Sequence, residues 1–377
     1  MNLKRLSGAT LIVIGLGLAG GVGWLALKGP ATPTPAWQKE PIVPTAIPEA
    51  GQTESGPADF FATVPPYDTL PIAAAEARPR FGVGVPYPPL DPEIAVQLEL
   101  GWYLSWRVSD SPLPADEVPF WQMIRLSESA FRPDAPLIRD IAQAQPGSTW
   151  LIGNEPDVIW QDNVTPEQYA RWYHELYLLL KESDPTSRVA IGGVTQPTPL
   201  RLEYLERVLA AYEATYNQPM PVEVWNIHNF ILPEQRSGWG VDIPPGLEAE
   251  QGILYDLEHH DDLEIFKAQL INFRQWLADH GQRDKPLMVS EYGILMPADY
   301  GFGPERVERF MLGTYDFMLH AADAEIGYPA DDNRLVQGWA WYSLADDVYP
   351  TGNLVDLETG QITKLGQTHR DFILNLP

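Results

Sequence analysis

The sequence contains no cysteine among its 377 residues. Disulfide bonds, thiolate metal sites and cysteine nucleophiles are therefore excluded. Basic residues are also scarce, because 25 Lys and Arg stand against 51 Asp and Glu, which gives a formal net charge of −26. A field of that sign repels a polyanionic backbone, so nucleic acid is not an expected partner.

Charged residues are absent from residues 6–27, which directly follow Lys4 and Arg5. This apolar stretch is long enough to cross a bilayer, since a helix of roughly 20 residues suffices. A cleaved signal peptide is the alternative, but its apolar core needs only about 7–15 residues. We therefore expect an uncleaved anchor over residues 1–28. The preceding basic residues predict a single-pass protein of the cell membrane with its folded domain outside; cleavage would instead give a secreted protein.

Proline is concentrated after this segment, with eleven prolines in residues 28–79. Runs such as Gly29-Pro30-Ala31-Thr32-Pro33 cannot form a helix or a central strand. We therefore expect residues 29–79 to be an extended linker and residues 80–377 to form the folded domain.

Short apolar runs alternate with amphipathic stretches from residue 80 onward. Buried parallel strands have this near-continuous apolar character. The predicted strands are Phe81–Pro86, Gly101–Trp106, Val118–Leu126, Thr149–Asn154, Arg188–Val194, Val222–His228, Pro286–Glu291 and Val336–Tyr342.

Helix signals lie between several of these strands. Asp91-Pro92 and Thr165-Pro166 each place a capping residue before a proline, and residues 263–280 form an amphipathic stretch closed by Gly281. Eight strands alternating with helices predict an α/β fold, the (β/α)₈ TIM barrel. An open doubly wound sheet is the alternative. Between the second and third strands, residues 107–117 hold Ser, Pro and acidic residues, which suit a loop as well as a helix.

Two glutamates stand at the ends of predicted strands. Glu155 ends the fourth strand in an Asn-Glu-Pro-Asp run, and Glu291 ends the seventh in Val-Ser-Glu-Tyr-Gly. Barrel enzymes place their catalytic groups at this end of the strands, because the following loops build the active-site face. A single strand-end Glu is ordinarily structural, so it is the pair that indicates catalysis.

With this pair, residues 80–377 resemble the clan A glycoside hydrolases, retaining enzymes on a TIM barrel. Within the clan, the sequence is most similar to the Asl1-like glycosyl hydrolase family, which is associated with β-1,3-glucan hydrolysis. Cellulase-like and β-xylosidase-like families are nearly as similar. The segments that carry the resemblance are Trp102–Trp106, Val118–Trp121, Asn154–Asp157 and Ile227-His228.

The resemblance implies that Glu155 is the general acid/base and Glu291 the nucleophile of a hydrolase acting on β-linked glycans, glucan or xylan in type. A retaining mechanism needs the two carboxyl groups about 5–5.5 Å apart, and it needs one raised and one low pKa. The resemblance also implies that Asn154 bonds the sugar 2-hydroxyl and that Trp341 floors the subsite of the cleaved sugar.

The sequence departs from the clan at Phe230, where many relatives carry a tyrosine that bonds the nucleophile. Either Tyr292 or Tyr342 supplies this hydroxyl, or the nucleophile is tuned differently. His228 ends the sixth strand, which favours a substrate-site role over that of a hydrogen-bonded core histidine. The residues expected to contact the substrate are Asn154, His228, Trp341, Trp106, Tyr292 and Arg125; for Arg125 an ion pair at the barrel mouth is the alternative.

Metal ligands are not expected. The consecutive groups of His259-His260-Asp261-Asp262 point in different directions, and Asp331-Asp332-Asn333 lacks the spacing of a known calcium loop. We expect no cofactor, a monomer, and a poly- or oligosaccharide as the partner. Two other functions stay open, namely a catalytically inactive carbohydrate-binding barrel tethered at the cell surface and a metal-dependent barrel hydrolase.

Overall fold

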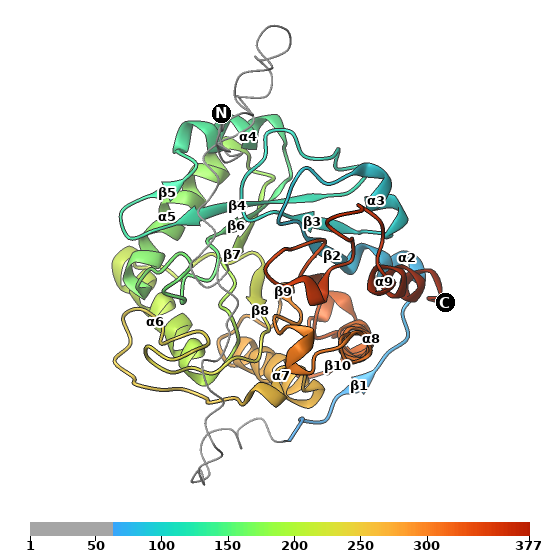
Figure 1. Cartoon of the computed structure of the whole chain (residues 1–377). Helices are drawn as coiled ribbons and strands as arrows, with labels where there is room; N and C mark the ends of the chain where they lie inside the picture. The colour runs from blue at the N-terminus through green and yellow to red at the C-terminus, as the bar shows by residue number, and fades with distance from the viewer. Residues whose placement is uncertain (1–62) are drawn as a thin grey trace, which may run out of the picture.

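The computed structural model describes residues 63–377, and the predicted anchor lies outside them. Eight parallel strands follow one another around a barrel, and helices surround them (Figure 1). Their spatial order is β7-β6-β4-β3-β2-β11-β9-β8. The strands are β2 (Phe81–Gly84), β3 (Trp102–Leu104), β4 (Phe120–Leu126), β6 (Thr149–Ile152), β7 (Arg188–Ile191), β8 (Trp225–His228), β9 (Leu287–Tyr292) and β11 (Gly338–Trp341).

The barrel closes between β7 and β8, the two ends of this order. Isolated parallel bridges join Ala190 to Val224 and Val194 to Ile227. The N–H of Ile191 also donates to the Val224 carbonyl at 3.1 Å. The predicted eight-stranded parallel barrel is therefore confirmed. Seven strands lie within the ranges expected from the sequence, and β9 extends one residue beyond its range, to Tyr292.

Seven helices in the described chain follow barrel strands. They are α3 (Pro92–Gln97), α4 (Ala135–Ala144), α5 (Pro166–Ser183), α6 (Pro199–Tyr216), α7 (Leu263–Asp279), α8 (Pro304–His320) and α9 (Lys364–Leu374). The predicted caps are present, because Asp91 accepts from two N–H groups of α3 and Thr165 forms a capping box with Gln168. No helix lies between β3 and β4, so residues 107–117 belong to a loop.

Folded elements precede residue 80 in the described chain. Strand β1 (Asp68–Thr69) pairs antiparallel with β10 (Ala321–Ala322), and α2 (Ala74–Ala77) and the 3₁₀ turn η2 (Arg78–Arg80) follow. Ile72 and Ala77 are buried. The predicted linker boundary at residue 79 therefore falls inside η2, because prolines in this segment sit between short elements that pack on the barrel. Within residues 63–377 we find no helix with the length and apolar character needed to span a membrane.

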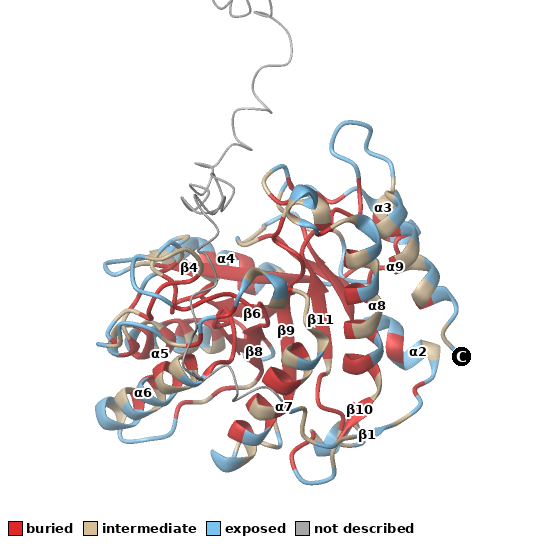
Figure 2. Ribbon diagram, turned by 60° about the horizontal axis from the view of Figure 1, so that its bottom comes forward, coloured by how far each residue is buried: buried red, intermediate tan, exposed pale blue. Residues whose placement is uncertain are grey.

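Two apolar layers fill the domain. Side chains facing into the barrel form the inner layer: Trp102, Leu104, Trp121, Met123, Leu151, Ala190, Val224, Met288 and Ala340. Their neighbours along each strand face outward and pack against the inner faces of the helices, which are buried while the outer faces are exposed (Figure 2). This is the two-sided burial that near-continuous apolar strands require.

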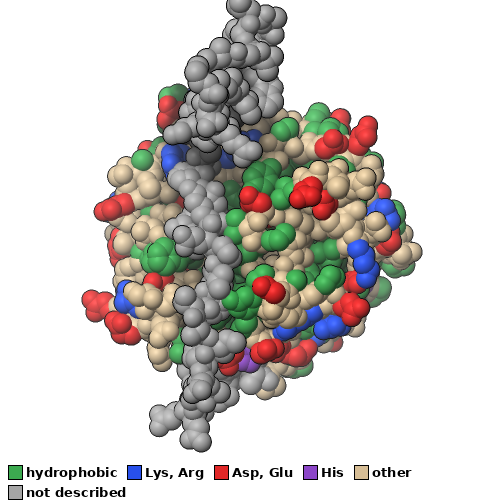
Figure 3. Space-filling model, in the orientation of Figure 1, with side chains coloured by type: hydrophobic (Ala, Val, Ile, Leu, Met, Phe, Trp, Pro, Cys, Tyr) green, Lys and Arg blue, Asp and Glu red, His purple; other side chains and the backbone are tan. Residues whose placement is uncertain are grey.

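The outer surface carries acidic, basic and apolar side chains together (Figure 3). On the face that Figure 3 shows, acidic side chains are spread among apolar and basic ones rather than gathered in one patch. The two acidic motifs considered as metal sites are explained by pairing. Asp262 caps α7, Asp261 forms an ion pair with Arg306, and Asp331 forms one with Arg80.

Candidate active site

Glu155 and Glu291 meet at the carboxyl end of the barrel. One carboxylate oxygen from each and one ring nitrogen of His228 all lie within 4.8 Å of one another. Glu155 is in the loop after β6, Glu291 is in β9, and His228 is the last residue of β8. All three side chains are at most 3% exposed. The structure therefore brings together the carboxylate pair and the histidine that the sequence singled out.

His228 lies between the two carboxylates. Its Nδ1 is 2.9 Å from Oε1 of Glu155, and its Nε2 is 3.8 Å from Oε2 of Glu291. A Cβ at Gly193 would lie 2.7 Å from Cδ2 of His228, so a glycine is needed where this ring passes the backbone. The histidine can thus stabilise negative charge on either carboxylate.

The donor to Glu291 is Trp106. Its indole Nε1 donates to Oε2 of Glu291 at 2.7 Å. The ring packs over β2, where a Cβ at Gly84 would lie 2.6 Å from the Trp106 ring. Trp106 has a φ of 48°, a left-handed conformation that is unusual for a tryptophan and that turns its ring toward the site.

Neither tyrosine hydroxyl expected at this place bonds Glu291. The Tyr292 hydroxyl accepts from Thr314 at 3.4 Å, and the Tyr342 hydroxyl donates to Asp346 at 2.6 Å. An indole N–H therefore supplies the donor that is missing at Phe230. From the sequence, Trp106 was expected to contact the substrate, and its bond to Glu291 was missed. The clan pattern places a tyrosine hydroxyl after the sixth strand, whereas this indole follows β3.

Trp341 and Tyr292 do not line the site, contrary to expectation. Both side chains are 0% exposed, and their rings pack edge to face 5.3 Å apart in the layer under α8. Trp341 Nε1 donates to the Gly352 carbonyl. The aromatic residue of this strand end that faces the site is Tyr342, whose ring lies 5.6 Å from that of Trp106. Alternation along a strand explains the error, because a shift of one residue moves the side chain to the other face.

Arg125, in β4, and Asn154, directly before Glu155, both bond Asp162 in the loop after β6. Arg125 forms an ion pair with Asp162 at 2.7 Å, and its other contact is Gln161. The alternative considered for this arginine, an ion pair, is thus what the structure shows. Asn154 is 1% exposed, and its backbone N–H donates to Asp162. Its Oδ1 has no hydrogen-bond partner, as expected of an acceptor kept for a ligand.

Burial controls the charges of the site. It raises the pKa of Glu291 to about 7; the His228 charge and the Trp106 hydrogen bond lower this pKa, while the Glu155 charge raises it. Burial lowers the pKa of His228, but the charge of Glu291 and the hydrogen bond with Glu155 outweigh it, so this pKa stands above its ordinary value. Shifts of this kind, caused by burial together with a specific charged neighbour, are typical of groups that take part in acid–base chemistry.

Glu155, His228 and Glu291 also have the spacing of a metal site, and no other such group occurs within residues 63–377. Each of the three groups has a hydrogen-bond partner without an ion, since His228 bonds Glu155 and Trp106 bonds Glu291. A chelator distinguishes a metal-dependent reaction from an acid–base reaction at this site.

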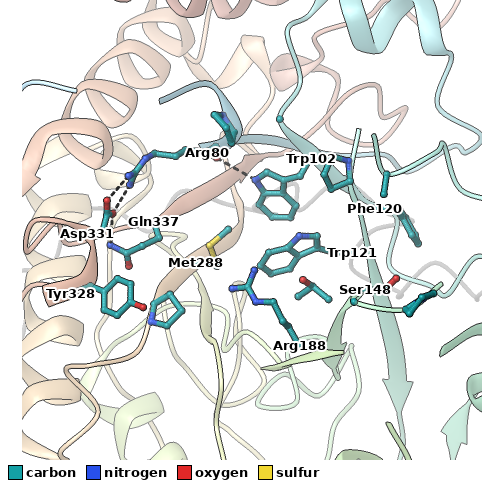
Figure 4. A pocket seen from close by; sticks show the side chains of 18 residues that line it. Arg80, Trp102, Phe120, Trp121, Ser148, Arg188, Met288, Tyr328, Asp331 and Gln337 are labelled. Atoms are coloured by element: carbon teal, nitrogen blue, oxygen red, sulfur yellow. Dashed lines mark hydrogen bonds and ion pairs between the residues drawn. The ribbon is translucent and has the colours of Figure 1, made fainter. Parts of the chain in front are cut away.

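A separate cavity of about 640 Å³ opens at the amino end of the barrel. Figure 4 shows Trp102 and Trp121 on its wall, with Arg80 paired to Asp331. The indole of Trp102 donates to the Arg80 carbonyl, and Gln337 donates to Asp331. The polar groups on this side bond one another, and none of the residues expected at the active site lines the cavity.

Comparison with known proteins supports the fold. No protein-family model and no curated protein matches the chain. A GH128 (subgroup II) endo-β-1,3-glucanase from Pseudomonas viridiflava is 19% identical, with a TM-score of 0.52 over 79% of this chain and 98% of that one. Its counterpart from Sorangium cellulosum is 16% identical, with a TM-score of 0.52 over 79% of this chain and 98% of that one. A curdlan-specific GH128 (subgroup III) exo-β-1,3-glucanase from Blastomyces gilchristii is 14% identical, with a TM-score of 0.51 over 78% and 99%. At these identities the likeness shows that the chains share a barrel fold.

The raised pKa of Glu291 makes a prediction about stability. Glu291 binds its proton more tightly in the folded state, so its contribution to stability is fully present below pH 4.5 and is lost as the pH rises through about 7. Glu291→Gln removes the buried charge and should stabilise the protein at pH 8 by up to roughly 3 kcal/mol. Urea unfolding at pH 4 and pH 8 measures this, and an equal difference at both pH values would contradict it.

Proposed function

We propose that the protein is a retaining glycoside hydrolase that cleaves β-linked glycans by double displacement. Glu155 is the general acid/base and Glu291 the nucleophile. The observation that carries the proposal is the approach of the two carboxylates to within 4.8 Å at the carboxyl end of a parallel barrel. Retaining glycosidases hold the pair about 5–5.5 Å apart, whereas inverting ones leave about 6.5–9.5 Å for a water.

The contacts of each carboxylate support this division of roles. Burial raises the pKa of Glu291 to about 7, and the Trp106 N–H and the His228 charge oppose this rise, so they favour the ionised state that a nucleophile needs. Glu155 has one oxygen, Oε2, with no partner. That oxygen is free to give a proton to the leaving glycosidic oxygen and later to take one from water. His228 contacts both groups and stabilises the charge as it moves between them.

The proposed substrate is a β-1,3-glucan, with xylan as the other candidate. The similar solved structures are β-1,3-glucanases, and the sequence resembles the Asl1-like family, which is associated with the same linkage. We further propose that this chain belongs to that family and acts as a monomer. A catalytically inactive sugar-binding barrel is the second candidate, and turnover separates it from the enzyme.

A substrate screen tests the proposal. The wild type should release reducing sugar from a β-1,3-glucan faster than from β-1,4-glucan or xylan, with no effect of EDTA. Glu155→Ala should lose about 10²–10⁴-fold, the usual contribution of a general acid. Azide should rescue Glu155→Ala and yield a β-glycosyl azide. Binding without turnover supports the inactive barrel, inhibition by EDTA supports a metal enzyme, and equal turnover by Glu291→Ala ends the nucleophile assignment.

Trp106→Phe tests the unusual donor. The Trp106 hydrogen bond lowers the pKa of Glu291, so removing it raises that pKa further above about 7. Because the nucleophile must be ionised, the acidic limb of the kcat/KM profile should move to higher pH. Tyr342→Phe is the matched control, since its hydroxyl bonds Asp346 and not Glu291. A shift in the Tyr342 variant alone would contradict the assignment.

We also propose that residues 1–28 anchor the protein in the cell membrane, with the barrel outside, although the structure does not describe them. The uncharged residues 6–27 behind Lys4 and Arg5 support this. The full chain should sediment with membranes, and a chain starting at residue 29 should stay in the supernatant. A full chain that is recovered soluble and shortened at its N-terminus would favour signal cleavage and secretion.

A further inference from the structure

A fully buried arginine links the loops around Glu155. Arg201, in α6, forms an ion pair with Asp157 (Nε to Oδ2, 2.8 Å) and another with Glu234. All three side chains are 0% exposed. The Nη2 of Arg201 donates to the carbonyls of Val241 and Asp242. One guanidinium therefore joins the loop after β6 to the long loop after β8, and buried charges stay in place only when paired in this way.

Asp157 carries this link to the loop after β7. Its Oδ2 accepts the Thr195 N–H at 3.2 Å. The two residues before Thr195 hold the site itself. The Gly193 carbonyl accepts the Glu155 N–H at 3.0 Å, and the Val194 carbonyl accepts the His228 N–H at 2.8 Å. Asp157 thus fastens the turn that carries Glu155 to the segment that positions both Glu155 and His228.

Glu155 needs such a fastening, because its backbone is strained. Its φ is 42°, in the left-handed region that a glutamate rarely adopts. Such a conformation is unfavourable and persists only when its surroundings impose it. Without the contacts of Asp157 to Arg201 and Thr195, the turn is expected to relax and the carboxyl group of Glu155 to move away from the leaving oxygen.

The charges of Arg201, Asp157 and Glu234 also affect the protonation of the site. Two carboxylates share one guanidinium, so a negative charge remains in excess two residues from Glu155. Burial raises the pKa of Asp157 to about 6; Arg201 opposes this and the charge of Glu155 adds to it. Asp157 also acts on His228, where its charge favours the protonated ring. The charge of Asp157 is therefore coupled electrostatically to Glu155 and His228.

We propose that Asp157 is a positioning residue for the general acid, held in place by Arg201. This role rests on the proposed function. Asp157 touches no substrate; it sets the geometry in which Glu155 delivers its proton. Its loss should weaken proton donation more than it weakens nucleophilic attack by Glu291.

Asp157→Asn tests this role with little risk to the fold, because the remaining Arg201–Glu234 pair is neutral. We would measure kcat/KM on aryl glycosides of the preferred sugar. A 2,4-dinitrophenyl group leaves without a proton, whereas a phenyl group needs one. The variant should lose about 10–100-fold with the phenyl leaving group, part of the usual contribution of a general acid. With dinitrophenyl the loss should be several times smaller.

Glu234→Gln is the matched control, because it removes the other carboxylate from the same guanidinium. It should affect both leaving groups equally. Should Asp157→Asn fail to fold, Arg201→Lys is the second variant; it keeps the charge but not the fork that holds both carboxylates, and the same selective loss is expected.

Equal losses with both leaving groups in the Asp157 variant, or a selective loss in Glu234→Gln, would overturn the positioning role while leaving the glycosidase intact. A wild type that hydrolyses none of the glycosides would reject the proposed function and this role with it.

Discussion

Two carboxyl groups held close together out of water are the constraint on which the site depends. Like charges at this distance repel, and burial penalises each of them, so neighbouring groups must stabilise whatever charge is present. His228 contacts both carboxylates, and Trp106 contacts one. The four residues come from the ends of β3, β6, β8 and β9 and the loops that follow. The closed parallel barrel brings these four strand ends to one mouth.

The fold could be predicted from the sequence because parallel barrel strands have a simple signature. Each is buried on both faces, so short apolar runs between capped helices located all eight of them. The missing helix between β3 and β4 was foreseen as an uncertainty, because Ser, Pro and acidic residues suit a loop. The contribution of residues 68–79 was not foreseen, because β1 and α2 are too short to leave a periodic pattern among prolines.

The site could be predicted only in part. Strand ends identified Glu155, His228 and Glu291, since their position along the chain fixes their position in the barrel. Side-chain direction could not be obtained in the same way, so Trp341 was placed in the site where Tyr342 stands. The replacement for the missing tyrosine also escaped prediction. Trp106 approaches Glu291 from 185 residues away in the sequence, through a left-handed backbone that no local pattern encodes.

The closure of the barrel between β7 and β8 has a consequence for how the protein loses its active site on heating. Strands β7 and β8 meet through isolated bridges rather than a continuous ladder. The bond from the His228 N–H to the Val194 carbonyl lies on this seam, and the adjacent Gly193 carbonyl accepts the Glu155 N–H from the loop after β6. Opening the seam therefore releases His228 and disturbs the segment that holds Glu155. On heating, the catalytic site should be lost before the domain unfolds, because the contact between β7 and β8 has few hydrogen bonds and lies next to the site.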